Sequence, residues 1–344
     1  MHGIKRVVYT TEALEAKKKR EQARMQEYLA LNDAILTKKR NHEMTREAFD
    51  LTTKMLEINP EFYTVWNYRR NILTNALFPQ TDKEGINALL SNDLALTTAA
   101  LKAHPKVYGI WNHRRWCLAN VPDGPGTAKD GDSNGWRQDY WNKELYLAER
   151  MLDADSRNFH AWNYRRYALE NMPVSRPTMN EMDYTMQKIK SNFSNFSAWH
   201  HRSKVLPSLW ESGQLQPSSS RETEFDLVRN AMYTDPNDQS VWMYHRWLVG
   251  SGDDRSLLER EIAAIQELLD AIQDEPDEGS DVKWCMESIV HYKRLLLRKH
   301  ALHVDNHALT KDCLSLLEDL QKQDPARRQR YKDIGAHLIG AVPC

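Results

Sequence analysis

Residues 65–70 read VWNYRR, and this phrase decides the fold because it returns four more times along the chain. The other copies are IWNHRR at 110–115, AWNYRR at 161–166, AWHHR at 198–202 and VWMYHR at 241–246. Their tryptophans are separated by 45, 51, 37 and 43 residues, which is the length of two helices with their turns. A repeat of this period predicts a solenoid of helical pairs.

A turn is expected just before each copy, because proline stands six residues before the tryptophan in three of them. The residues at this position are Pro60, Pro105, Ser156, Phe193 and Pro236. Apolar residues three or four apart lie upstream and predict a first helix, for example Ala48, Leu51, Met55 and Ile58. Four pairs with capping-box spacing predict helix starts at Thr81 with Glu84, Thr178 with Glu181, Ser219 with Glu222 and Ser256 with Glu259.

The predicted fold is all-α, an alpha-alpha superhelix built as a right-handed solenoid of helical hairpins. We expect one helical-repeat domain over residues 1–344, with an N-terminal segment and helix at 1–40. The predicted repeats cover 41–78, 82–121, 136–172, 178–212 and 218–250. A degenerate sixth repeat is expected at 255–300 and a C-terminal cap at 306–344.

The repeated side chains are interpreted as architecture and interface. A tryptophan near the start of each second helix buries about 150–250 Å² against the neighbouring pair. Arginines three and four residues later share one helical face, so they can reach carboxylates of the next repeat or of a partner. The predicted set is Trp66, Asn67, Arg69, Arg70, Trp111, Asn112, Arg114, Arg115, Trp162, Asn163, Arg165, Arg166, Trp199, His201, Arg202, Trp242, Tyr244 and Arg246.

Composition excludes several kinds of partner. Lys plus Arg at 47 nearly cancels Asp plus Glu at 48, so the chain lacks the basic excess that binds nucleic acid. No apolar run approaches the roughly 18 residues of a membrane span. The four cysteines are far apart and form no C-x-x-C pair, which fits a reducing, cytoplasmic location.

No self-contained catalytic motif is visible. The sequence has no phosphate-binding loop, no G-x-S-x-G, no H-E-x-x-H and no Gly-rich dinucleotide turn. His300, His303 and His307 have helix-like spacing, but residues 304–306 read as a turn that breaks the face, so we expect no metal site in this chain. An enzyme built on this chain must therefore obtain its active site from a partner.

The Trp-x-x-Arg-Arg phrase, repeated five times after a turn, resembles the repeat of protein prenyltransferase alpha subunits. Within that family, three stretches are similar to the Rab geranylgeranyltransferase (type II) members: Met1-His2-Gly3, RNFHAWNYRR at 157–166 and NFSNFSAWHHRS at 192–203. The resemblance spans nearly the whole chain. No further domain is visible, so the chain looks like the compact form found in fungi.

This resemblance implies an obligate heterodimer with a beta subunit that holds zinc and the co-substrate geranylgeranyl diphosphate. The enzyme would transfer geranylgeranyl to C-terminal cysteines of Rab GTPases presented by Rab escort protein. The family places a basic residue of the third repeat near the diphosphate, and Arg157 holds that position here where the farnesyltransferase subunit has lysine. The N-terminal His2 is a candidate ligand for the open zinc position of the beta subunit.

Two alternatives remain open at the level of sequence. The first is that the chain is the alpha subunit shared by farnesyltransferase and type I geranylgeranyltransferase, and the second is that it is a non-enzymatic helical-repeat adaptor of the tetratricopeptide type. Tetratricopeptide units hold to about 34 residues and place small residues at their packing points, which argues against the adaptor. Rab preference, the surface that meets the escort protein and the order of substrate binding are not encoded in any recognisable motif.

Overall fold

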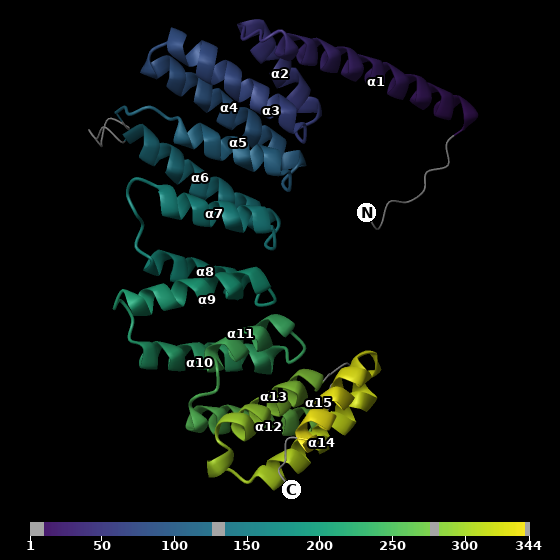
Figure 1. Ribbon diagram of the computed structural model, residues 1–344, viewed down its shortest axis with the longest axis vertical. Helices are drawn as coiled ribbons and strands as arrows, with labels where there is room; N and C mark the ends of the chain where they lie inside the picture. Colours follow the sequence, from purple (N-terminus) through teal and green to yellow (C-terminus); the bar gives the residue numbers. More distant parts are fainter. Residues whose placement is uncertain (1–9, 126–134, 276–281, 341–344) are drawn as a thin grey trace. The chain divides into compact units, whose positions relative to one another are not determined.

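The computed structural model describes residues 10–125, 135–275 and 282–340, and within these ranges every regular element is a helix (Figure 1). The chain divides into two compact units, Met1–Ser175 and Arg176–Cys344. Each unit is a stack of helical pairs. The prediction of an all-α fold of the alpha-alpha superhelix class is therefore confirmed, whereas the single domain stays a prediction.

The first unit begins with a long helix, α1 (Thr11–Arg40), which packs against α2 through its C-terminal part. Three pairs follow: α2 (Arg46–Ile58) with α3 (Tyr63–Ile72), α4 (Lys83–Ala103) with α5 (Tyr108–Ala119), and α6 (Gly135–Ala154) with α7 (Phe159–Asn171). Short π and 3₁₀ turns, η1 (Leu73–Leu77) and η2 (Phe78–Gln80), extend α3. The second helices α3, α5 and α7 contact one another in order, which builds the stack seen in Figure 1.

The second unit continues the same arrangement with four pairs. These are α8 (Met179–Ser191) with α9 (Phe196–Glu211), α10 (Pro217–Thr234) with α11 (Gln239–Val249), α12 (Arg255–Asp274) with α13 (Lys283–Lys299), and α14 (Asn306–Gln323) with α15 (Arg328–Gly340). Short 3₁₀ turns η3 (Ala301–His303) and η4 (Pro325–Arg327) flank α14. The helices α12 and α13 lie in the segment predicted as a sixth repeat, and α14 and α15 lie in the predicted cap.

The turn inside most pairs is built by one short polar residue seven positions before the tryptophan. Asn59, Asp155, Asn192 and Asp235 each accept a hydrogen bond from the backbone N–H two residues later, at 2.9–3.1 Å. The hydrogen bond from the backbone to this side chain stabilises the turn, so the turn does not require a proline. In the last three copies of the phrase, a second polar residue caps the helix that carries the phrase. Asn158, Asn195 and Asp238 are the N-caps of α7, α9 and α11.

None of the four predicted residues makes the capping hydrogen bond from its side chain, and only Thr178 stands at the N-cap position where it was predicted. Helices α4 and α12 are capped by Asp82 and Asp254, which accept hydrogen bonds from Gly85 N–H and Leu257 N–H. Thr178 stands at the start of α8 without a capping hydrogen bond, and Ser219 lies inside the first turn of α10. Asp82 and Asp254 cap α4 and α12 in place of Thr81 and Ser256 because aspartate is as good a cap as a hydroxyl residue, and its negative charge is favourable at a helix N-terminus.

The buried face of α2 also differs from the predicted one. Ala48 and Met55 are buried as expected, but Ile58 is 58% exposed, and Thr52 occupies a fully buried position. Thr52 is buried because its hydroxyl binds Arg69. Because the buried Thr52 is polar, the apolar residues of α2 alone do not mark its buried face. The apolar pattern therefore includes Ile58 in that face, although Ile58 is exposed.

Candidate functional site

Every tryptophan of the repeated phrase makes the same hydrogen bond. Its indole N–H donates to the main-chain carbonyl six residues upstream. The distances are 2.8 Å for Trp66, 3.0 Å for Trp111, 2.9 Å for Trp162, 2.6 Å for Trp199 and 2.8 Å for Trp242. The acceptors are Pro60, Pro105, Ser156, Phe193 and Pro236. Since only a carbonyl is needed, serine and phenylalanine serve at this position as well as proline.

The first arginine of the phrase binds a carboxylate in the next helical pair with two parallel hydrogen bonds from Nε and Nη2. The pairs are Arg69 with Asp93 (2.9 and 2.6 Å), Arg114 with Glu144 (2.8 and 2.5 Å) and Arg202 with Glu224 (2.7 and 2.6 Å). No side chain in these pairs is more than 5% exposed. Buried, bidentate pairs of this kind fix the spacing between neighbouring repeats.

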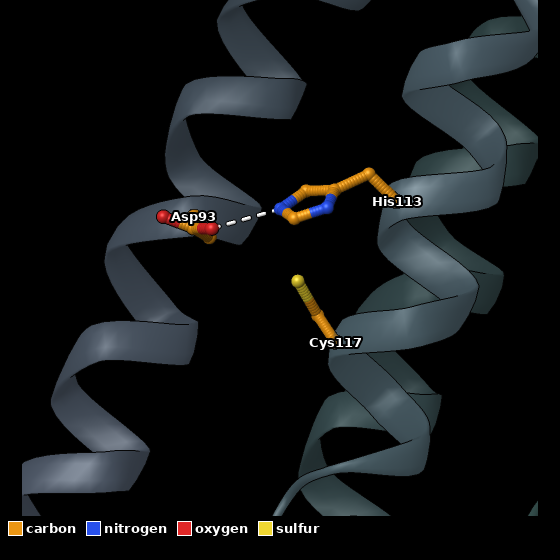
Figure 2. Close-up of side chains that lie close together, drawn as sticks. All are labelled: Asp93, His113 and Cys117. Carbon is orange, nitrogen blue, oxygen red and sulfur yellow. Dashed lines mark hydrogen bonds and ion pairs between the residues drawn. The ribbon is translucent and has the colours of Figure 1, made fainter. Parts of the chain in front are cut away.

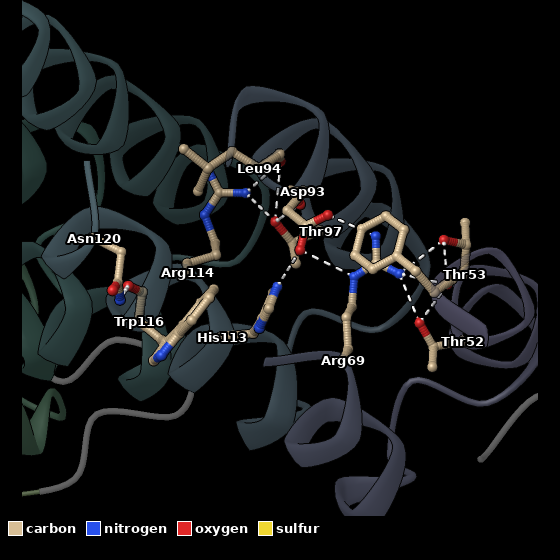
Figure 3. A network of polar contacts seen from close by, with 11 residues as sticks. Thr52, Thr53, Arg69, Asp93, Leu94, Thr97, His113, Arg114, Trp116 and Asn120 are labelled. Carbon is tan, nitrogen blue, oxygen red and sulfur yellow. Dashed lines mark hydrogen bonds and ion pairs between the residues drawn. The ribbon is translucent and has the colours of Figure 1, made fainter. Parts of the chain in front are cut away.

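The remaining guanidinium nitrogen, Nη1, binds the first helix of the same pair. Arg114 Nη1 donates to the Leu94 carbonyl at 2.8 Å and to the hydroxyls of Thr97 and Thr98 at 2.7 and 2.9 Å. Arg69 repeats the pattern on α2. Figure 3 shows Arg69 between Asp93 on one side and Thr52 and Thr53 on the other, and it shows Arg114 beside Leu94 and Thr97. Each guanidinium therefore connects three helices: the one that carries it, its pair mate and the first helix of the next pair.

A second donor completes each carboxylate, and it comes from the residue two positions after the tryptophan. His113 binds Asp93 (2.8 Å), His201 binds Glu181 (3.0 Å), Tyr244 binds Glu224 (2.6 Å), and Tyr164 donates to Glu144. In all four cases the donor follows the carboxylate by 20 residues. These carboxylates are not among the residues predicted from the sequence, although their constant spacing of 20 residues from the second donor is a signal that identifies them.

Ionisation states follow from the same contacts. Burial alone would raise the pKa of Asp93, but hydrogen bonds from His113 and Arg69 outweigh it, so the pKa lies below its ordinary value. Burial lowers the pKa of His113 despite its carboxylate neighbour. The network therefore consists of an ionised Asp93, a charged Arg69 and a neutral His113, with its charges balanced inside the chain.

The fifth copy of the phrase replaces the first arginine by His245. His245 Nε2 lies 2.9 Å from Glu261, and its Nδ1 lies 2.7 Å from the Tyr292 hydroxyl. Glu261 also accepts hydrogen bonds from Arg229 and Arg260. Burial opposes ionisation, but the hydrogen bonds from His245 and Arg229 are stronger and lower the pKa of Glu261 to about 2.

The second arginine of the phrase is not satisfied in this way. Arg70, Arg115 and Arg246 are half-buried, and their Nε atoms are buried without a hydrogen-bond partner among the described residues. Arg115 stacks over Tyr167 at 4.5 Å, and Arg246 lies 3.8 Å from Glu287. The asparagine that directly follows the tryptophan in the first three copies is exposed at Asn67 and Asn163 and half-buried at Asn112. These positions, with the half-buried Arg166, are the members of the predicted set that are not fully buried, and their interface role stays a prediction.

One buried trio, Asp93, His113 and Cys117, brings three possible metal ligands within 4.8 Å of one another (Figure 2). Its donor set does not suit a cation. Both oxygens of Asp93 already bind the guanidinium of Arg69, whose positive charge opposes a metal ion. Burial raises the pKa of Cys117 well above its ordinary value, so the thiol stays protonated. The trio belongs to the structural network.

Arg157 lies in the exposed turn before α7, and its backbone N–H donates to Asp155 at 3.1 Å. No carboxylate in the described parts of the chain pairs with its guanidinium. His2 lies outside the described residues, and so does the C-terminal Cys344.

Comparison with known proteins agrees with the geometry. The family described as "Protein prenyltransferase alpha subunit repeat" matches residues 45–76, 90–121, 141–172, 178–209 and 221–251. The "Geranylgeranyl transferase type-2 subunit alpha" of Schizosaccharomyces pombe is 38% identical over 97% of this chain and 97% of its own length. The protein of that name from Candida albicans is 31% identical over 99% and 98%. The human one is 37% identical, over 75% of this chain and 43% of its own length.

A solved structure supports the fold. The "Candida albicans protein geranylgeranyltransferase-I complexed with GGPP" aligns with a TM-score of 0.64 at 19% identity, covering 98% of this chain and 93% of that chain. No described helix is long and apolar enough to cross a bilayer. The chain belongs to the family of geranylgeranyl transferase type-2 alpha subunits, which are built from protein prenyltransferase alpha-subunit repeats.

Proposed function

We propose that this chain is the alpha subunit of a heterodimeric Rab geranylgeranyltransferase. The observation that carries this proposal is the 38% identity to a type-2 alpha subunit over 97% of both chains. The heterodimer transfers the geranylgeranyl group of geranylgeranyl diphosphate to C-terminal cysteines of Rab GTPases, which Rab escort protein presents. It acts in the cytoplasm, which agrees with the buried cysteines Cys117 and Cys313, which form no disulfide.

The interior chemistry of this chain supports a division of labour with a beta subunit. The buried carboxylates and arginines described above hydrogen-bond to each other between neighbouring repeats. They therefore hold helices in place and do not bind substrate. Zinc on the beta subunit would supply the activated thiolate of the Rab cysteine. This chain supplies a rigid support and, at its exposed turns, side chains that approach the substrate.

Arg157 is the side chain that we assign to the diphosphate. It is exposed, positively charged and unpaired, and it lies immediately before α7, whose cap Asn158 is buried and fixed by hydrogen bonds. A guanidinium in this place offsets the negative charge that develops on the leaving diphosphate. Arginine also forms bidentate hydrogen bonds with phosphate oxygens that lysine cannot form.

His2 is assigned a regulatory role. A neutral imidazole is a good zinc ligand, so the N-terminal segment can occupy the open zinc position of the beta subunit until the Rab cysteine displaces it. In His2→Ala heterodimer, zinc coordination without substrate should change, as measured by X-ray absorption. Unchanged coordination and unchanged basal activity would show that His2 has no such role.

The acceptor substrate tests the proposed function. Co-purified heterodimer is offered labelled geranylgeranyl diphosphate with either a Rab bound to escort protein or a free CaaX peptide. We expect transfer to the escorted Rab. Transfer only to the peptide would identify the chain as the subunit shared by farnesyltransferase and type I geranylgeranyltransferase, and a lone monomer that binds peptide tails would identify an adaptor.

A further inference from the structure

Three arginines surround one buried carboxylate in the second unit. Glu287 of α13 pairs with Arg246 of α11 at 3.8 Å. It also pairs with Arg327 of η4 at 3.5 Å and with Arg330 of α15 at 3.8 Å. Within the described parts of the chain, its one hydrogen bond comes from the hydroxyl of Tyr331, at 2.7 Å. The three guanidiniums therefore lie near this carboxylate without donating hydrogen bonds to it, unlike the bidentate arginines of the earlier repeats.

A cavity of about 40 Å³ lies beside this cluster. Arg246 and Arg330 line it together with a fourth arginine, Arg294 of α13, and the apolar side chains Leu317 and Leu320 of α14 line it as well. One water-sized group needs about 10–15 Å³ measured in this way. The cavity therefore has room for the oxygens of a small anion and is far too small for a prenyl chain.

Positive charge exceeds negative charge around this cavity. Besides Glu287, the nearby carboxylate is Asp324, which lies 3.7 Å from Arg327, so four guanidiniums face two carboxylates. Arg294 pairs with no carboxylate in the described ranges, and the buried Nε of Arg246 has no hydrogen-bond partner there. Guanidiniums at close range repel one another, and a bound anion removes that repulsion while it accepts their hydrogen bonds.

His291 of α13 also lines the cavity. Burial lowers its pKa, and the charges of Arg246, Arg294 and Arg298 lower it further, to about 4. Its imidazole is therefore uncharged at neutral pH and has one N–H to donate. A donor-rich cavity with an excess of positive charge suits an oxyanion and disfavours a metal cation.

We infer that this cavity is a binding site for a small oxyanion of the phosphate class, held by Arg246, Arg294 and Arg330. Arginine forms paired, charge-assisted hydrogen bonds with phosphate oxygens. Because the three arginines belong to α11, α13 and α15, a bound phosphate joins the C-terminal helical pair to the last copy of the repeated phrase. The inference does not depend on the proposed function, since it uses no residue that we assign to prenyl transfer.

Equilibrium dialysis of the co-purified heterodimer against radiolabelled inorganic phosphate tests this site. Saturating geranylgeranyl diphosphate is present, so that phosphate does not enter the place of the prenyl donor. We expect the wild-type heterodimer to bind phosphate, and Arg294→Gln should raise the Kd by about tenfold or more. Arg330→Gln should raise it as well, whereas Arg294→Lys should recover part of the affinity because it keeps the charge.

Thermal melts of the same samples separate a ligand site from a structural role. Arg294 has no ion pair to lose, so Arg294→Gln should melt no lower than wild type in phosphate-free buffer. Phosphate should raise the Tm of wild type more than that of Arg294→Gln at equal ionic strength. Arg328→Gln is the matched control, because it removes an exposed arginine of α15 that does not line the cavity, and it should behave as wild type.

A wild-type heterodimer that binds no phosphate under these conditions would overturn the inference, as expected if an acidic side chain of the partner subunit fills the cavity. A Kd within twofold of wild type in folded Arg294→Gln protein would overturn it too. So would an equal loss in Arg328→Gln, because that indicates a general effect of surface charge. These results leave the proposed function untouched, since it is decided by transfer to the escorted Rab.

Discussion

At the scale of single residues, the buried arginines act as three-way connectors whose charge is balanced by one carboxylate. Removing that charge should be costly, because breaking one partner of a buried pair leaves an uncompensated ion. In Glu144→Gln, Arg114 loses its counter-ion while the volume of the side chain is kept. We expect the free energy of unfolding, measured by urea denaturation, to fall by about 3–5 kcal/mol.

Asp153→Asn is the matched control for that experiment. Asp153 also pairs with an arginine, Arg150, but the two side chains are 42% and 63% exposed. Its loss should change stability by less than about 1 kcal/mol. Similar small losses in both variants would show that the buried pairs do not hold the repeats together.

Glu261 makes stability depend on pH. Its pKa is lowered to about 2 in the folded chain from an ordinary value of 4.5, so the folded state binds fewer protons than the unfolded state between these values. Its contribution is fully present above pH 4.5 and is lost as the pH falls toward 2. Thermal melts should show a steeper loss of Tm over this window in wild type than in Glu261→Gln. Parallel pH profiles would contradict the assignment.

The residues of this network were only half predictable. The arginines are visible because they sit in the repeated phrase, whereas the carboxylates sit in first helices whose sequences differ. Position and spacing reveal them only when the partner is known. In the first repeat this position is held by the buried Ala48 and not by a carboxylate. No copy of the phrase precedes it in the described chain, so there is no arginine whose charge a carboxylate would have to balance.

At the scale of the element, the turn before each of α3, α5, α7, α9 and α11 is fixed by the hydrogen bond from the indole. Trp111→Phe keeps an aromatic ring in the core but leaves the Pro105 carbonyl without its donor. We expect a loss of about 1–3 kcal/mol in the free energy of unfolding, less than the 3–5 kcal/mol of a tryptophan-to-alanine change.

The half-buried Trp116 provides the comparison on the same helix. Its indole stacks on Phe78 and donates no hydrogen bond within the described residues, so Trp116→Phe should cost less than Trp111→Phe. The reverse order would show that ring packing, and not the indole N–H, decides the stability of the turn.

Helices were predictable from sequence because apolar periodicity and turn signals coincide, but their ends were not. Two of the predicted capping boxes, at Thr81 and Ser256, do not form because a neighbouring aspartate, Asp82 or Asp254, accepts the hydrogen bond from the backbone amide instead. The prediction that Ile58 lies on the buried face of α2 is wrong for another reason. A buried threonine that binds an arginine looks polar in the sequence and belongs to the core in the structure.

At the scale of the whole molecule, the repeat predicts the class of fold because each helical pair can bury its apolar face only against a neighbour. The site could not be derived in the same way. Arg157 is singled out by resemblance, and the turn that carries it is held by contacts of Asp155 with Lys106 and of Asn158 with Pro105, which join residues of different repeats. Contacts of this kind depend on how turns align in space, and no local pattern encodes them.

The most direct test of the central claim compares geranylgeranyl transfer to an escorted Rab by this chain alone and by the chain co-purified with a prenyltransferase beta subunit. We expect no transfer by the chain alone and zinc-dependent transfer by the heterodimer. Transfer by the isolated chain, or failure to form a heterodimer that is active on the Rab, would contradict it.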